Sequence, residues 1–251
     1  MTRDWTRQVL ESFDQSAQRY NGGATLQRAV AHRIAGHCLR VAIPPGLWVD
    51  LGSGTGFLAD ALTQIHPGQK VLRLDGSKAM LARHPRGEAT LVADLNQTLP
   101  RWEPRPTLMT SSFTLHWLHQ PTRVLKHWFT RLACPGWMIL SVPVNGSFLQ
   151  WKQAAEHTGL PCTALPLPDR EALLGAIPRD AVWRCSTLRF TQQADHPLEL
   201  LRSMVTIGAG TSPAARMSPS AWRTLFQAWP REHSSGRALL TWHCLLMILR
   251  R

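Results

Sequence analysis

A glycine-rich segment between an apolar run and a helical pattern constrains this chain most. Gly52, Gly54 and Gly56 stand at alternate positions, after the run at 48–51 and before the helical pattern at 57–65. Glycine permits sharp turns and lets a ligand approach the main chain closely. A strand, a glycine turn and a helix N-terminus form a nucleotide site at the carboxyl end of a parallel sheet. A dinucleotide fingerprint would place its third glycine where Phe57 stands, so a different nucleotide site is predicted.

Acidic side chains accompany the predicted strand ends. Asp50 lies in the first strand, Asp75 ends a second at 70–75, and Asp94 follows a third at 89–93. A carboxylate fixed at the end of the second strand can accept hydrogen bonds from both hydroxyls of a ribose. Ser77 is expected to cap the next helix.

This series resembles motif I and the following strand ends of the class I S-adenosylmethionine-dependent methyltransferases. The resemblance implies an α/β, Rossmann-like sheet that is mostly parallel and ends in an antiparallel hairpin. S-adenosyl-L-methionine is then the expected cofactor. The resemblance implies cofactor contacts from Asp50, Gly52, Ser53, Gly54, Gly56, Asp75, Gly76, Asp94, Leu95 and Ser112.

Composition excludes several other classes. The chain of 251 residues suffices for one large α/β domain with insertions, and no apolar run approaches the ~18 residues of a membrane span. The first residues do not read as a signal peptide, and the five cysteines are dispersed without a C-x-x-C pair, which favours reduced thiols and a cytoplasmic location. The histidines form no H-x-x-x-H pair with a nearby acid, so no metal site is expected.

Periodicity divides the chain into a helical start and an alternating core. Two amphipathic helices are predicted, separated by Asn21-Gly22-Gly23, and the antiparallel hairpin is expected from the last two strand patterns. We expect an N-terminal helical lid segment at 1–45 and a methyltransferase domain at 46–251. The predicted helices span 5–20 and 24–41, the hairpin strands 182–192 and 239–250, and the lid insertions about 147–180 and 195–217.

A narrower resemblance extends from about residue 11 to the end. The segment 200–209, LLRSMVTIGA, is similar to the L-L-R-S-L-K-x-I-G-A run of the malonyl-[acyl-carrier protein] O-methyltransferases of biotin synthesis. Phe13, Ala17 and Tyr20 fit that family's N-terminal pattern. The chain departs from the family where Val205 replaces Lys, Ser112 replaces Asn and His116 replaces Gln.

That resemblance implies methylation of the free carboxylate of a malonyl thioester. The carboxylate is already ionised at neutral pH, so positioning and desolvation can supply most of the catalysis without a general base. A cation is expected to select the carboxylate, and Arg202 is the candidate because a guanidinium can donate two parallel hydrogen bonds. Tyr20 and His116 are the other candidate catalytic residues. The expected partner is an acidic acyl carrier protein bearing a malonyl group, or malonyl-CoA, which suits the net charge of +12.

Three alternatives stay open at this stage. A small-molecule methyltransferase of another pathway is favoured slightly by Val205. The pI near 10.9 suggests an RNA methyltransferase, yet no RNA-binding module or N-P-P-Y motif is present, so a nucleic-acid partner is not expected, nor is a membrane. A catalytically silent scaffold is the third, and the intact glycine and acidic positions argue against it.

Overall fold

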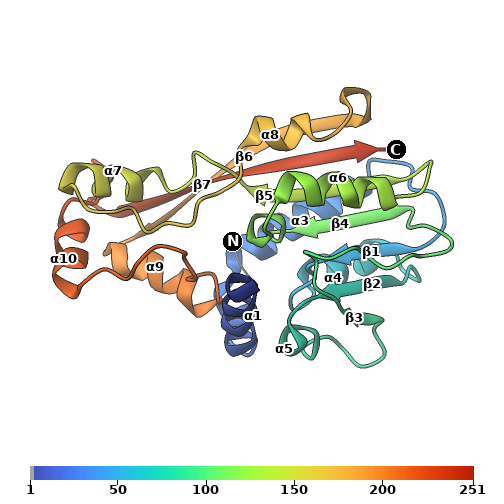
Figure 1. Cartoon of the computed structure of the whole chain (residues 1–251), viewed down its shortest axis with the longest axis horizontal. Coiled ribbons are helices and arrows are strands. Elements are labelled where there is room, and N and C mark those ends of the chain that lie inside the picture. Colours follow the sequence, from blue (N-terminus) through green and yellow to red (C-terminus); the bar gives the residue numbers. More distant parts are fainter. Residues whose placement is uncertain (1–2) are drawn as a thin grey trace.

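The computed structural model describes residues 3–251 and contains one seven-stranded sheet (Figure 1). Its strand order is β3-β2-β1-β4-β5-β7-β6. The strands are β1 (Trp48–Leu51), β2 (Val71–Asp75), β3 (Thr90–Val92), β4 (Leu108–Ser112), β5 (Trp137–Pro143), β6 (Val182–Ala194) and β7 (Ala238–Arg250). The helices are α1 (Arg3–Ser16), α2 (Tyr20–Gly23), α3 (Thr25–Cys38), α4 (Phe57–Ile65), α5 (Lys78–Leu81), α6 (Pro121–Arg131), α7 (Leu149–Thr158), α8 (Arg170–Gly175), α9 (Pro197–Thr206) and α10 (Pro219–Gln227), with 3-10 turns η1 (Leu115–Trp117) and η2 (Arg179–Ala181).

The predicted fold class is confirmed by the strand pairing. Strands β1 to β5 pair in parallel, whereas β7 runs antiparallel to both β5 and β6. The long β6–β7 ladder is the hairpin that the sequence predicts, and it brings Phe190 opposite Trp242.

Strand alternation builds a core on each face of the sheet. In β5, Trp137 and Ile139 join the cluster that contains α3 and α4, while Met138 and Leu140 join the cluster that contains α6 and α8. Side chains point alternately to opposite faces of a strand, so a sheet covered on both faces needs such continuous apolar runs. Every residue of β5 is accordingly buried.

The N-terminal helices differ from the prediction at their boundary. The Asn-Gly-Gly segment does not break the chain but belongs to the single turn α2, where Ala24 N donates to Tyr20 O at 2.9 Å. Helix α3 ends at Cys38 rather than at 41, and its Ile34 is completely buried against the sheet. Because α3 packs into the core, we place the lid hypothesis on about residues 3–24, where it stays a prediction.

The site lies where the parallel strands end. In Figure 1 the carboxyl ends of β1, β2 and β4 face α1, and α9, α7 and α10 lie beyond it. Among the described helices, none is both long enough and apolar enough to span a bilayer.

Candidate active site

The glycine turn is tied to the second strand by backbone hydrogen bonds. The N–H groups of Gly52 and Ser53 both donate to Leu74 O at 2.8 Å, and Gly54 N donates to Asp75 Oδ2 at 2.8 Å. A Cβ on Gly52 would lie 2.0 Å from Thr114 Oγ1, whereas one on Gly54 would meet nothing within 4 Å. Gly52 therefore permits close packing, and Gly54, with φ +55°, leaves open space beside the turn.

That open space belongs to a cleft of about 720 Å³, a volume that includes space open to solvent. Asp75 lies at the cleft, and burial raises the pKa of its carboxyl despite the N–H donors of Ser77, Gly54 and Gly76. The cleft is lined by Thr6, Val9, Leu10, Phe13, Tyr20, Gly52, Gly54, Asp75, Gly76, Met80, Asp94, Leu95, Asn96, Ser112, Phe113, Thr114, Trp117 and Leu118.

Seven of the ten residues predicted to contact the cofactor line this cleft. They are Gly52, Gly54, Asp75, Gly76, Asp94, Leu95 and Ser112. The other three, Asp50, Ser53 and Gly56, are not among its lining residues. A Cβ on Gly56 would meet His84 and Arg73 at 3.0–3.1 Å, so this glycine makes room for side chains packed against the turn.

Asp50 carries an unusual charge environment in β1. Its side chain is buried, Oδ1 accepts from Thr110 Oγ1 at 3.0 Å, and Oδ2 lacks a hydrogen-bond partner among the described residues. Burial raises the pKa of Asp50 to about 6. A cationic or hydrogen-donating group near the turn would therefore stabilise its ionised form.

Helix α1 closes one side of the cleft. Its Val9, Leu10 and Phe13 line the cleft. Ser12 Oγ donates to Gly208 O at 3.0 Å, and Asp14 Oδ1 accepts from Ser77 Oγ at 2.5 Å. The helix is thus anchored both beside β2 and beside the loop after α9.

A second hollow of about 410 Å³, including space open to solvent, adjoins the cleft. We call it the acceptor chamber. It shares Phe13, Tyr20, Phe113 and Trp117 with the cleft, so these aromatic side chains stand at the junction. The remaining lining residues are Gln27, His116, Phe148, Leu165, Leu167, Met204, Ile207, Ala209 and Trp242. None of the residues that line the chamber is a Lys or Arg.

Two predicted catalytic residues meet at this chamber. Burial raises the pKa of the Tyr20 hydroxyl, which therefore stays a hydrogen-bond donor at neutral pH. Burial lowers the pKa of His116 to about 3, so its ring is neutral, and its Nδ1 has no partner among the described residues. Both side chains can therefore donate hydrogen bonds to a bound methyl acceptor. Neither is a cation that could form an ion pair with it.

Arg202, the third predicted catalytic residue, lies elsewhere. Its exposed side chain lines an open groove between α1, α9 and α10, which we call the arginine groove. The groove also contains Arg216, Arg223 and Arg231. It shares Leu165, Met204 and Ala209 with the acceptor chamber, so the three hollows form a series from the groove to the cleft.

Sequence reasoning missed some residues of the site. Phe113 has φ +54°, which is unusual for a residue with a side chain, and lines both the cleft and the chamber. Its place directly after β4, at the carboxyl edge, was the available signal. Gln27 also lines the chamber, although the sequence placed it only in the N-terminal lid segment and not among the site residues.

The cleft suits S-adenosylmethionine on several counts. Ser112 Oγ is buried at the cleft without a partner among the described residues, Asp75 offers further lone pairs for a ribose, and Gly54 leaves the backbone accessible. A family described as "Methyltransferase domain" matches residues 24–177.

The chain belongs to the methyltransferase domain family.

S-adenosyl-L-methionine is the cofactor of this methyltransferase, as the sequence predicts. A curated relative, malonyl-[acyl-carrier protein] O-methyltransferase of Laribacter hongkongensis, is 27% identical over 93% of this chain and 85% of its own. A trans-aconitate 2-methyltransferase of Mycolicibacterium gilvum is 36% identical, over only 39% of this chain and 38% of its own. A putative methyltransferase from Bacillus halodurans has a similar crystal structure, with a TM-score of 0.59 and 13% identity over 86% of this chain and 97% of its own.

The described residues contain no group of three or more His, Cys, Asp or Glu side chains that could hold a metal ion. When bound, S-adenosyl-L-methionine would supply a methyl group activated by its sulfonium, with S-adenosylhomocysteine as the leaving group. Phe113, Trp117 and Tyr20 line both the cleft and the chamber, so they lie where the cofactor and an acceptor would meet.

Proposed function

We propose that this methyltransferase transfers a methyl group to the free carboxylate of a malonyl thioester carried by an acyl carrier protein. The observation that supports this most is the series of hollows: a cofactor cleft, an apolar acceptor chamber and an arginine groove that is open to solvent. A thioester on a long flexible arm could reach from the groove into the chamber. The Laribacter relative, with its high coverage, points the same way.

The chamber acts on the acceptor by positioning and desolvation. A malonyl carboxylate is already ionised and needs no base. None of the residues that line the chamber carries a charge at neutral pH. The neutral donors Tyr20 and His116 would orient the carboxylate, while the surrounding aromatic rings remove water from it. Loss of hydration strengthens an anionic nucleophile toward a sulfonium carbon.

The arginine groove would receive the carrier. Four arginines line it, against Glu11 as the only acidic side chain among its lining residues. Acidic carrier surfaces and phosphate groups on the arm are both complementary to such a groove. Arg202 would act here, at the outer end of the acceptor's path, rather than among the residues that line the chamber.

A small-molecule acceptor is the second candidate. No cation lines the chamber, and the trans-aconitate 2-methyltransferase that matches 39% of this chain is named for a free acid.

An acceptor panel tests the proposal. The protein is incubated with a labelled methyl donor and, separately, malonyl-carrier protein, malonyl-CoA, trans-aconitate and bulk RNA. We expect the highest kcat/KM with malonyl-carrier protein. Faster labelling of trans-aconitate would favour the small-molecule candidate, and labelling of RNA alone would overturn the proposal.

A further inference from the structure

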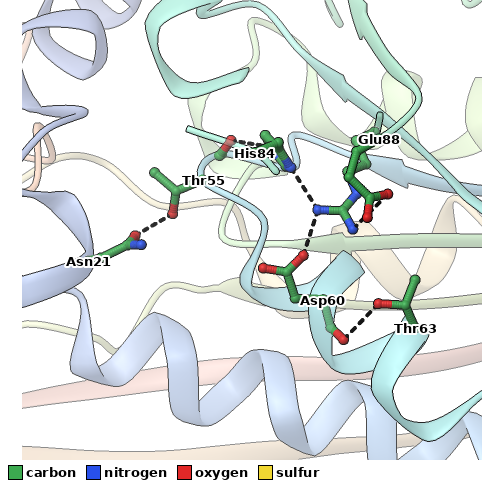
Figure 2. Close-up of polar contacts among 8 residues, drawn as sticks. Asn21, Thr55, Asp60, Thr63, His84 and Glu88 are labelled. Atoms are coloured by element: carbon green, nitrogen blue, oxygen red, sulfur yellow. Dashed lines mark hydrogen bonds and ion pairs between the residues drawn. The ribbon is translucent and has the colours of Figure 1, made fainter. Parts of the chain in front are cut away.

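A buried arginine lies against the glycine turn and is not part of the cleft. Arg73 projects from β2 and is completely inaccessible to solvent. Its Nη1 donates to Asp60 Oδ1 at 2.6 Å, and its Nη2 forms an ion pair with Glu88 Oε2 at 3.1 Å. Figure 2 shows these carboxylates converging on the guanidinium. A buried guanidinium is costly unless it is paired, so the two acids account for its charge.

The same guanidinium makes a third contact, which the ion pairs do not require. Arg73 Nη1 lies 2.8 Å from His84 Nδ1, and His84 Nε2 lies 2.9 Å from Gly54 O (Figure 2). A guanidinium can only donate, so Nδ1 must accept. The proton of the neutral ring then sits on Nε2, where it is donated to the carbonyl of Gly54.

Gly54 is consequently held at both of its backbone polar groups. Its N–H donates to Asp75 Oδ2 at 2.8 Å, and its carbonyl accepts from His84 Nε2. Because Arg73 and Asp75 are two residues apart in β2, strand alternation puts both side chains on one face, against the turn. Gly56 completes the arrangement, since a Cβ there would crowd both His84 and Arg73.

We propose that Arg73 and His84 are positioning residues for S-adenosylmethionine. Arg73 fixes the tautomer of His84, and His84 fixes the Gly54 peptide, so that the turn keeps the shape that lines the cleft. Neither residue lines the cleft itself. The proposal concerns cofactor affinity alone, so it does not depend on which acceptor the enzyme uses.

The arrangement makes cofactor affinity sensitive to acid. Protonation of His84 at Nδ1 would place two donors against each other and break the contact with Arg73. The groups that face the ring are Arg73, Asp60 and Glu88. Burial and the Arg73 charge lower the pKa of His84 below its ordinary 6.5, against the weaker opposing effect of the two acids and the bond to Gly54. The neutral ring is therefore the form that holds Gly54. Affinity for S-adenosylmethionine should fall as the pH is lowered through the pKa of His84, which lies below 6.5.

The test compares two variants by calorimetry with S-adenosylhomocysteine, using the full chain. His84→Leu fills similar space without donors and should weaken binding roughly 5- to 10-fold at neutral pH, the value of one neutral hydrogen bond. His84→Gln can present an N–H to Gly54 and an oxygen to Arg73 without titrating. We expect it to keep most of the affinity at neutral pH and to lose less of it than the parent as the pH is lowered step by step below 6.5.

His66→Gln is the matched control, because His66 packs on Trp48 and does not contact the turn. It should leave both the affinity and its pH dependence unchanged. An independent readout on the unliganded protein is the ¹⁵N chemical shift of His84, which should report a proton on Nε2. Parental affinity in a folded His84→Leu, an unaltered acid limb in His84→Gln, or a proton on Nδ1 would each overturn the proposal.

Discussion

At the scale of single residues, one carboxylate both shapes the cofactor site and faces it. Asp75 accepts N–H groups from Gly54 and Ser77, each at 2.8 Å, and still lines the cleft. Each carboxylate oxygen has two lone pairs, so these bonds leave acceptor capacity for a ribose. The side chain therefore connects the end of β2, the glycine turn and the ligand.

Replacing Asp75 with Ala should weaken S-adenosylmethionine binding by roughly 1.5–3 kcal/mol, because a charged acceptor is lost. Titration calorimetry measures the change. Asp169→Ala is the control, since Asp169 caps α8 by accepting from Ala172 N and lies outside the cleft. Unchanged affinity in Asp75→Ala would remove this residue from the cofactor site.

Gly54 offers a matched pair of substitutions. Gly54 has φ +55° and Gly159, at the end of α7, has φ +66°, and a Cβ on either would meet no atom within 4 Å. Alanine should cost each about 1–2 kcal/mol of unfolding free energy from left-handed strain. Only Gly54→Ala should also reduce cofactor affinity, because its Cβ would enter the cleft. Thermal melts of both variants measure the cost of backbone strain, and calorimetry measures cofactor affinity. Equal losses of affinity in the two variants would show that the Cβ at position 54 does not obstruct the cofactor.

At the scale of elements, α1 is the segment best placed to act as a lid. It lines the cleft through Val9, Leu10 and Phe13, whereas α3 is fixed in the core. Its anchors to the rest of the protein include two side-chain hydrogen bonds, Ser12 to Gly208 and Ser77 to Asp14. Segments that cover ligands come from regions of low local stability and tighten on binding.

Hydrogen exchange should therefore slow across residues 3–16 when S-adenosylhomocysteine binds, by more than it slows in α3. The peptide that covers α6, on the opposite face of the sheet, serves as an internal reference. If α1 exchanged equally fast with and without ligand, it would be a fixed wall of the site and not a lid.

The elements that the sequence predicted best are those with a strong local pattern. The apolar strands, the turn from Gly52 to Gly56 and the cap at Ser77, which accepts from Met80 N at 3.0 Å, all depend on neighbouring residues in the chain. The acceptor chamber depends on contacts between distant segments, such as Phe148 with Trp242 at 4.6 Å between ring centroids. No local pattern reports that distance. The contacts of Arg73 could not be predicted either, because its partners Asp60 and His84 come from separate segments of the chain.

At the scale of the whole molecule, part of the positive charge is gathered in the arginine groove. The arginine groove opens beside the acceptor chamber, and Arg202 and Val205, three residues apart on α9, line it together. The position where the family has Lys is thus in the groove as well. Charge in this region would steer an acidic carrier and weaken with added salt.

Arg202→Ala should lower kcat/KM for malonyl-carrier protein while leaving S-adenosylmethionine affinity nearly unchanged, and Arg202→Lys should recover part of the loss. Arg33→Ala, an exposed arginine on α3 outside the groove, is the control. Initial rates at several carrier concentrations and two salt concentrations provide the measurement. A parental rate in Arg202→Ala would show that the groove recognises its partner through other residues.

The most direct test of the account compares malonyl-carrier protein with acetyl-carrier protein, which lacks only the free carboxylate. After incubation with S-adenosylmethionine, mass spectrometry of each intact carrier detects an added methyl group, and mild ester hydrolysis shows whether the group is a methyl ester. We expect a methyl ester on the malonyl carrier and no methylation of the acetyl carrier. Equal methylation of both carriers, or of neither while another acid is methylated, would contradict the proposed acceptor.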